Sequence, residues 1–279
     1  MNYDPYEISK DTREIEDTAQ FELILSHPIY MPVDGDSNFN RYNLSDEEKD
    51  AVAWVEKQNN ILGFSKMWEL VNNHIELIPN QIAYVWHGMM SFSKHCKNED
   101  VDIKEIMWRT IENRLARTWR SKLIEFHTEM RLKELYPSAR VISSHMIDLI
   151  LGVDIVVEIG GQRFYLHLLK NSTYSNASAK NKSKLGYLIE GYRDGQPVTA
   201  TYKREFEHSS HLFLKFDMEE TFTTKTINGN VLFKDDYLKR TLEEAIRDKR
   251  GEVIGESGQI SKFYHWLKLV KDRNPDFVL

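Results

Sequence analysis

The sequence predicts a mixed α+β protein in which helices flank a central sheet, and three observations support this class. Apolar residues recur at three- and four-residue spacings through the first half of the chain, which is typical of amphipathic helices. From residue 140 the pattern changes to a period of two with many β-branched residues, which favours strands. Segments 236–250 and 260–270 return to helical spacing, so helices are expected again at the end.

Proline, glycine and helix-capping residues divide the first half of the chain into an irregular arm and several expected helices. The opening residues are rich in proline, glycine and aspartate, so they predict an irregular arm with one helix near 14–25. Ser45-Asp46-Glu47-Glu48 forms a capping box, because a serine hydroxyl and a glutamate three residues later satisfy each other's backbone amides. The helices expected after it span residues 45–58, 64–77, 81–95 and 103–135.

Period-two segments then predict a sheet that contains a hairpin. Strands are expected at 140–143, 153–159, 163–169, 198–206 and 211–217. Gly160-Gly161 separates the second from the third as a two-residue turn, and Asn228-Gly229 is a turn between two short strands. The predicted organisation is an acidic irregular arm (1–44), a helical subdomain (45–109), an α/β core (110–235) and C-terminal helices (236–279).

Cysteine content and hydropathy favour a cytoplasmic protein without a membrane span. Cys96 is the single cysteine, and neither a secretory leader nor an 18-residue apolar run is present. His74, His87 and His95 lack the spacing of a zinc site, so structural histidines are the favoured interpretation over zinc ligands.

Charge is distributed unevenly around a net value of −6. Residues 1–50 carry a net charge of −9, so this acidic arm is a candidate for contact with a basic protein partner. Residues 163–204 carry a net charge of +6. Within them Lys180, Lys182 and Lys184 are candidate DNA phosphate contacts, although a plain solvated loop has the same composition.

Three positions carry the chemistry that phosphodiester hydrolysis needs. A divalent cation polarises the phosphate and requires carboxylate oxygens, and a cationic group must stand near the reacting oxygens. The chain offers Glu129 on its longest helix, Asp154 after Gly152-Val153 at the opening of one strand, and Lys170 at the close of the next.

This order resembles the PD-(D/E)xK superfamily, which includes many restriction and repair nucleases, over residues 110–220. The resemblance implies a restriction-endonuclease-like central sheet and a metal-dependent DNA endonuclease that uses Mg²⁺, with Mn²⁺ as the alternative. It implies that Asp154 binds the cation and that Lys170 assists attack. Glu129 matches the family's helix glutamate as a metal ligand, with Glu125 as the competing choice.

One position departs from the family pattern, because Leu168 stands where an acidic residue is expected. A three-residue turn would pair Asp154 with Leu168, whereas a two-residue turn pairs Asp154 with His167. The two-residue turn makes His167 a further candidate for the catalytic set, although a packed strand histidine is the commoner role. In that register Lys170 faces away from Asp154 unless a bulge intervenes.

Three explanations of the missing carboxylate stay open at this point. Glu129, Glu125 or Glu158 supplies it from another position, or catalysis has been lost, or the likeness is coincidental. Two functions follow, and a third, an acidic mimic of DNA, is disfavoured because the acidic residues are concentrated in the N-terminal arm. The first is an endonuclease whose N-terminal and C-terminal helices add specificity or homodimer contacts, and the second is an inactive nuclease-shaped protein that binds or inhibits a nucleic-acid-processing partner.

Overall fold

The structure is a computed structural model, and it describes residues 17–33, 45–47, 49–51, 79–98, 104–143, 153–170, 188–193, 196–201, 210–216 and 222–254. The chain forms two compact units. The first contains residues 1–127 and 226–230, and the second contains residues 128–225 and 231–279. Helix α6 (Glu105–Leu135) contributes to both, so the boundary expected between residues 109 and 110 falls inside a helix.

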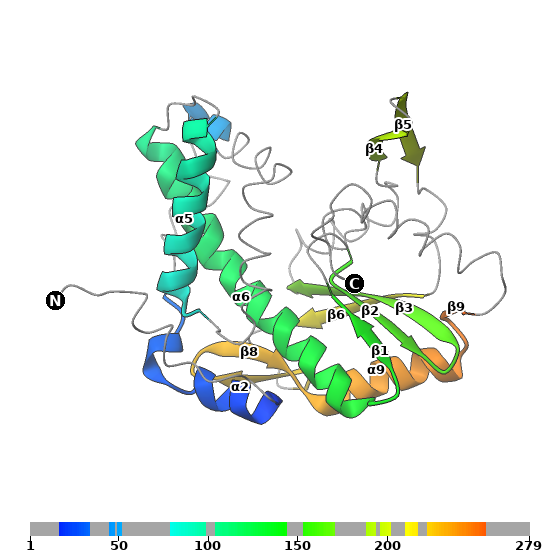
Figure 1. The fold of residues 1–279 in the computed structure, drawn as a ribbon. Helices are drawn as coiled ribbons and strands as arrows, with labels where there is room; N and C mark the ends of the chain where they lie inside the picture. The colour runs from blue at the N-terminus through cyan, green and yellow to red at the C-terminus, as the bar shows by residue number, and fades with distance from the viewer. Residues whose placement is uncertain are drawn as a thin grey trace. The chain divides into compact units, whose positions relative to one another are not determined.

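Apart from residues 226–230, the described residues of the first unit are mainly helical (Figure 1). The helices are α2 (Thr18–Leu25), the short 3₁₀ helix η1 (Pro28–Tyr30), α5 (Gln81–Asn98) and the first part of α6. The Asp17 carboxylate caps α2 by accepting from the Gln20 amide at 2.8 Å, and Asn80 caps α5 by accepting from the Ala83 amide at 2.9 Å. Such caps satisfy amides that the first helical turn leaves without partners.

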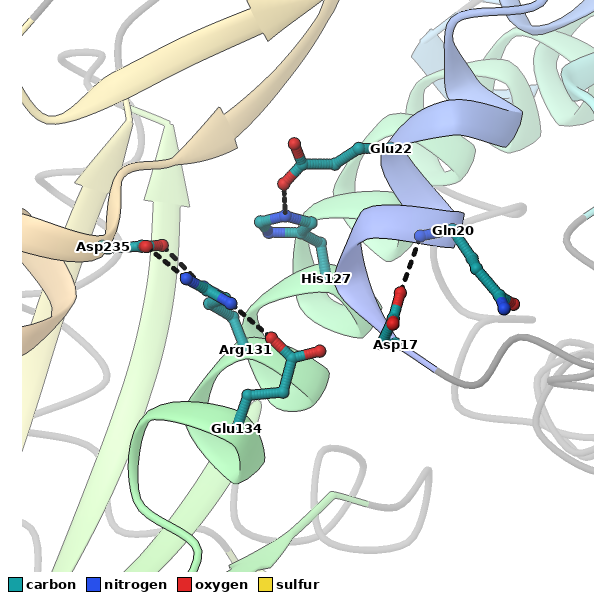
Figure 2. Close-up of polar contacts among 7 residues, drawn as sticks. All are labelled: Asp17, Gln20, Glu22, His127, Arg131, Glu134 and Asp235. Atoms are coloured by element: carbon teal, nitrogen blue, oxygen red, sulfur yellow. Dashed lines mark hydrogen bonds and ion pairs between the residues drawn. The ribbon is translucent and has the colours of Figure 1, made fainter.

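Polar contacts connect these helices inside their apolar packing. The buried Trp119 on α6 donates from its indole N–H to the Pro79 carbonyl at 2.8 Å. His127, fully buried on the same helix, lies 2.8 Å from the Glu22 carboxylate of α2 (Figure 2). Its ring also packs edge-on against Phe21. A buried imidazole needs such a partner, because an unpaired polar group in the core is destabilising.

The second unit contains a mixed sheet in the order β1-β2-β3-β6. Its strands are β1 (Arg140–Ile142), β2 (Ile155–Ile159), β3 (Gln162–Lys170) and β6 (His211–Phe216). β2 runs antiparallel to both β1 and β3, whereas β6 runs parallel to β3. The two-residue β9 (Glu252–Val253) pairs antiparallel with the start of β3. Helices together with this sheet confirm the α+β class.

The hairpin turn has the length that the sequence predicts. Gly160 and Gly161 have φ angles of +57° and +73°, a region that side chains disfavour, and Ile159 pairs directly with Gln162. Ile155, Val156 and Val157 are all fully buried although successive residues point to opposite faces, so both faces of the sheet are covered, as expected.

The remaining strands form two hairpins, and the sequence predicted them unevenly. β7 (Thr224–Ile227) and β8 (Asn230–Phe233) join through Asn228-Gly229 as expected. β5 (Gln196–Thr201) begins two residues before the predicted strand 198–206, whose residues 202–206 lie outside the described part of the chain. β4 (Leu188–Arg193) and β9 were not predicted. The expected helices at 64–77 and 260–270 lie outside the described residues.

Helix α9 (Asp235–Arg247) confirms the predicted amphipathic helix and buries Leu238, Leu242 and Ala245. The Arg131 guanidinium of α6 makes a two-pronged ion pair with the Asp235 carboxylate, with one N–O distance of 2.7 Å, and also contacts Glu134 (Figure 2). Among the described residues, no helix is both long and apolar enough to cross a membrane.

The Arg131–Asp235 pair predicts a pH dependence of folding. The hydrogen bond from Arg131 lowers the pKa of Asp235 below its ordinary value of 3.8. Its contribution to the free energy of unfolding is therefore present above pH 3.8 and is lost as the pH falls toward the lower, folded-state pKa. Replacing Asp235 with Asn should flatten the acid limb of a stability curve measured by urea unfolding at successive pH values. An unchanged acid limb would contradict this assignment.

Gly251, between α9 and β9, predicts a steric effect. A Cβ atom there would lie 2.6 Å from Gln162 Cβ and 2.7 Å from Phe164 Cζ. Gly251→Ala should therefore lower the free energy of unfolding by about 1–3 kcal/mol, the usual range for overpacking. Gly160→Asn is the matched control, because nothing lies within 4 Å of Gly160 and asparagine tolerates its positive φ. Equal losses in both variants would contradict the steric account.

Candidate active site

Asp154 lies at an irregularity where β2 begins. Its backbone amide donates to the Leu166 carbonyl at 3.1 Å, although Leu166 is already the partner of Ile155. Two residues of one strand therefore face one residue of the other, as in a β-bulge. The Asp154 carboxylate accepts a hydrogen bond from the Leu168 amide at 2.6 Å, so it lies beside the position where the family pattern expects an acidic side chain.

Strand β3 fixes the faces of the other candidates. Its register with β6 is regular from Tyr165 to Lys170, so side chains alternate between the two faces. His167 and Lys170 are three positions apart and project from opposite faces, whereas Leu168 and Lys170 share one. With regular pairing, the Asp154 side chain would face away from Lys170. A bulge at Asp154 shifts the pairing by one residue, which turns the Asp154 side chain to the face of Lys170.

Glu129 on α6 reaches the end of β1. Ser143, the residue after β1, donates from its hydroxyl to one Glu129 oxygen, and Lys133 Nζ lies 2.5 Å from the other. The Glu129 side chain is only 11% exposed, whereas that of Lys133 is 53% exposed. Glu129 is thus a largely buried carboxylate that is held between an α6 lysine and a β1-end serine.

These groups gather at one end of three neighbouring strands. Ile142 pairs with Val156, so Ser143 lies one step further toward Asp154 along the same edge. Asp154 contacts Leu168 across the next pair of strands. Lys170 is exposed two residues later, at the end of β3. The end of the sheet away from the Gly160-Gly161 turn therefore combines two carboxylates with a lysine.

The other two glutamates considered as replacements for the missing carboxylate have different surroundings. Glu125 lies 2.5 Å from the buried Lys122 and belongs to the first unit. Glu158 pairs with Arg163 at 2.8 Å next to the hairpin turn. Four residues of strand separate Glu158 from Asp154, about 13 Å at the usual rise. Glu158 is therefore too far along β2 to join Asp154 around one cation.

His167 belongs to a row of rings that crosses β3 and β6. Its Nε2 lies 2.8 Å from His211 Nδ1, and its ring stacks on Phe213, while His211 stacks on Tyr165. His167 is 1% exposed. Tyr165 continues the row to Glu252, to which its hydroxyl donates at 2.5 Å. Burial and then the Glu252 charge raise the pKa of Tyr165, so this phenol stays protonated at neutral pH.

The remaining metal and phosphate candidates can be placed only in part. No group of three or more histidine, cysteine, aspartate or glutamate side chains could hold a metal ion within the described ranges. Cys96 is buried on α5. Lys180, Lys182 and Lys184 lie outside the described residues, so their side relative to Asp154 stays a prediction.

Sequence reasoning missed the partners of its own candidates. His211, Ser143 and Lys133 contact His167 and Glu129, yet none of them stood out in the sequence. Lys133 follows Glu129 by four residues, a spacing that brings side chains together on a helix, so this pair had a local signal. His211 is 44 residues from His167 and had none.

Comparison with known proteins adds no assignment. No protein-family model matches the chain, and neither a curated protein nor a solved structure matches it.

The hydrogen bond between Asp154 and Leu168 predicts that two substitutions of Asp154 lower the free energy of unfolding by different amounts. Asp154→Ala leaves the Leu168 amide without this acceptor and should lower the free energy of unfolding by about 1–2 kcal/mol. Asp154→Asn keeps an acceptor oxygen and should lose less than half of that. Urea unfolding followed by circular dichroism measures both, with the exposed Lys170→Met as the control. Equal destabilisation by Ala and Asn would show that the bond does not hold Asp154.

Proposed function

We propose that this chain is a metal-dependent DNA endonuclease of the PD-(D/E)xK type, with a restriction-endonuclease-like core in its second unit. The single observation that supports it most is the gathering of Glu129, Asp154 and Lys170 at one end of β1, β2 and β3. The resemblance expects a helix with a glutamate, a strand opened by an aspartate and a paired strand closed by carboxylate-x-lysine, and this chain matches it except that Leu168 stands at the carboxylate position.

In this proposal Asp154 and Glu129 are the protein ligands of Mg²⁺ or Mn²⁺. Magnesium is commonly held by one or two carboxylates together with substrate phosphate oxygens and water, so two carboxylates fit this mode. A carboxylate offers about four lone-pair sites, more than the bonds from Ser143 and Lys133 occupy on Glu129. The cation, when bound, supplies charge stabilisation and activation of water.

Lys170 then acts as the cationic group beside the phosphate. It is exposed at the end of β3 on the same face as Leu168, whose amide contacts Asp154. A lysine in that position can donate to a phosphate oxygen without desolvating an isolated charge in the core. The basic segment that follows, with Lys180, Lys182 and Lys184, is proposed to contact the DNA backbone through phosphates, which would add affinity without reading bases.

A second candidate function is a non-catalytic binding protein on the same scaffold, and two observations favour it. Leu168 cannot ligate a cation, and Lys133 already places a positive charge 2.5 Å from Glu129. In this proposal the acidic segment at the N-terminus engages a basic surface of a nucleic-acid-processing partner, because opposite charge steers and stabilises such encounters.

Cleavage of supercoiled and linear DNA over Mg²⁺ and Mn²⁺ concentrations distinguishes the two candidates. If the chain is a nuclease, Asp154→Asn should lower cleavage by at least about 100-fold, because even outer-shell partners of a metal contribute about 10- to 100-fold to activity. Glu129→Gln should lower cleavage as well. Glu244→Gln is the control, since Glu244 is exposed on α9 and should leave cleavage unchanged.

Leu168→Glu supplies the opposite test, because it restores an acidic side chain on the face of Lys170. In the nuclease proposal it raises metal affinity, measured by calorimetry, and cleavage. If wild-type protein leaves every DNA intact while Leu168→Glu gains metal-dependent cleavage, the second candidate is supported. If neither protein binds a divalent cation or cleaves DNA, the nuclease proposal is wrong for these substrates.

A further inference from the structure

The tip of the β7-β8 hairpin holds a segment near the start of the chain. We use "tip" for residues 228–230 and "strap" for residues 25–32. Asn228 and Gly229 have φ angles of +48° and +79°, which form a tight left-handed turn. From this turn Asn228 Nδ2 donates to the Leu25 carbonyl at 3.2 Å and to the His27 carbonyl at 2.9 Å. One amide therefore joins two carbonyls of the strap.

Two further contacts join the tip to the strap. Asn230, which is buried, donates from Nδ2 to the Tyr30 carbonyl at 2.8 Å. A Cβ at Gly229 would lie 3.2 Å from Pro32 Cδ, so the turn approaches the strap closely. The tip and the strap belong to the same compact unit although about 200 residues separate them, as the Asn230–Tyr30 bond shows.

The Asn228 side chain can react with the backbone amide of the next residue, because that residue is glycine. Asn228-Gly229 is the single Asn-Gly pair in the sequence. Glycine has no side chain to hinder the approach of its amide nitrogen to the preceding side chain. Attack by Gly229 N on Asn228 Cγ forms a C–N bond while the bond from Cγ to Nδ2 breaks and ammonia leaves. Water then opens the cyclic imide to aspartate or isoaspartate.

We propose that Asn228 is a deamidation site that the tip–strap contact protects, and that deamidation releases the strap. Attack requires the Asn228 side chain to turn toward Gly229, which breaks its bonds to Leu25 and His27. The reaction therefore proceeds from the opened tip. The product carboxylate accepts hydrogen bonds only, so it cannot donate to two carbonyl oxygens and is repelled by them. Because hydrolysis of the imide does not regenerate asparagine, the release of the strap is permanent.

The full-length chain, incubated at mildly alkaline pH under native conditions, tests this proposal. Trypsin then yields the peptide of residues 226–234, and tandem mass spectrometry locates the change from amide to acid. Asn230 in the same peptide is an internal control, because the β-branched Val231 hinders attack there. Deamidation of Asn228 should be slow in the native protein and fast in urea.

A substitution that weakens the contacts between the tip and the strap, but leaves Asn228-Gly229 unchanged, should accelerate deamidation. Asn230→Ala removes the bond to Tyr30 and should raise the native deamidation rate by about threefold to tenfold, the factor that one lost hydrogen bond gives. Pro32→Ala is a milder variant in case Asn230→Ala does not fold. Asn80→Ala removes the α5 cap instead and should leave the rate unchanged after correction for its fraction unfolded.

Hydrogen exchange gives an independent readout of release. Asn228→Asp, which imitates the product, should lower the protection of the Tyr30 and Met31 amides, whose acceptors lie in the strap. Equal deamidation rates in native protein and in urea would overturn the proposed protection. Unchanged strap protection in Asn228→Asp would overturn the proposed release.

Discussion

The arrangement of the second unit depends on the two-residue turn at Gly160-Gly161. Both residues have positive φ, which glycine adopts without the strain that a Cβ imposes, and the turn suits the right-handed twist of its strands. It pairs Ile159 with Gln162 and so fixes every pair down to Ile155 and Leu166. A slip of one residue would move each buried side chain of β2 into the packing on the opposite face and would lose this turn, so the turn geometry sets the register.

The two ends of this hairpin treat charge differently. Near the turn, Arg163 is 1% exposed and lies between Glu158 and Glu252, at 2.8 Å and 3.4 Å. A buried guanidinium requires such partners, since isolated charge in the core is strongly unfavourable. At the other end, Glu129 and Asp154 lie near strand ends beside an exposed lysine. The turn end is therefore occupied by structural ion pairs, whereas the other end of the sheet holds the largely buried Glu129 and the partly exposed Asp154.

Leu168 has two roles at the end of the sheet away from the Gly160-Gly161 turn. Its backbone amide fixes the Asp154 carboxylate, while its side chain stands where the resemblance expects a second acid. Glu129 supplies a carboxylate from α6, and its contact with Ser143 ties that helix to the end of β1. Backbone geometry thus positions Asp154, and helix α6 supplies Glu129 near the same end of the sheet.

The sequence by itself determined the elements whose cause is local. Helical spacing predicted α5, α6 and α9, period-two patterns predicted β1, β2, β3 and β6, and glycine pairs or Asn-Gly predicted two turns. These signals arise between residues within four positions of one another. The same reasoning missed β4 and the two-residue β9, which has too few residues to show a period.

Only the tertiary structure decided which distant groups meet. It brought His211 to His167, Ser143 to Glu129 and the 228–230 tip to the strap, and it introduced the irregularity that places Asp154 beside Leu168. Such contacts depend on how helices and strands pack, because a side chain's own neighbours in the chain do not specify a partner 44 or 200 residues away.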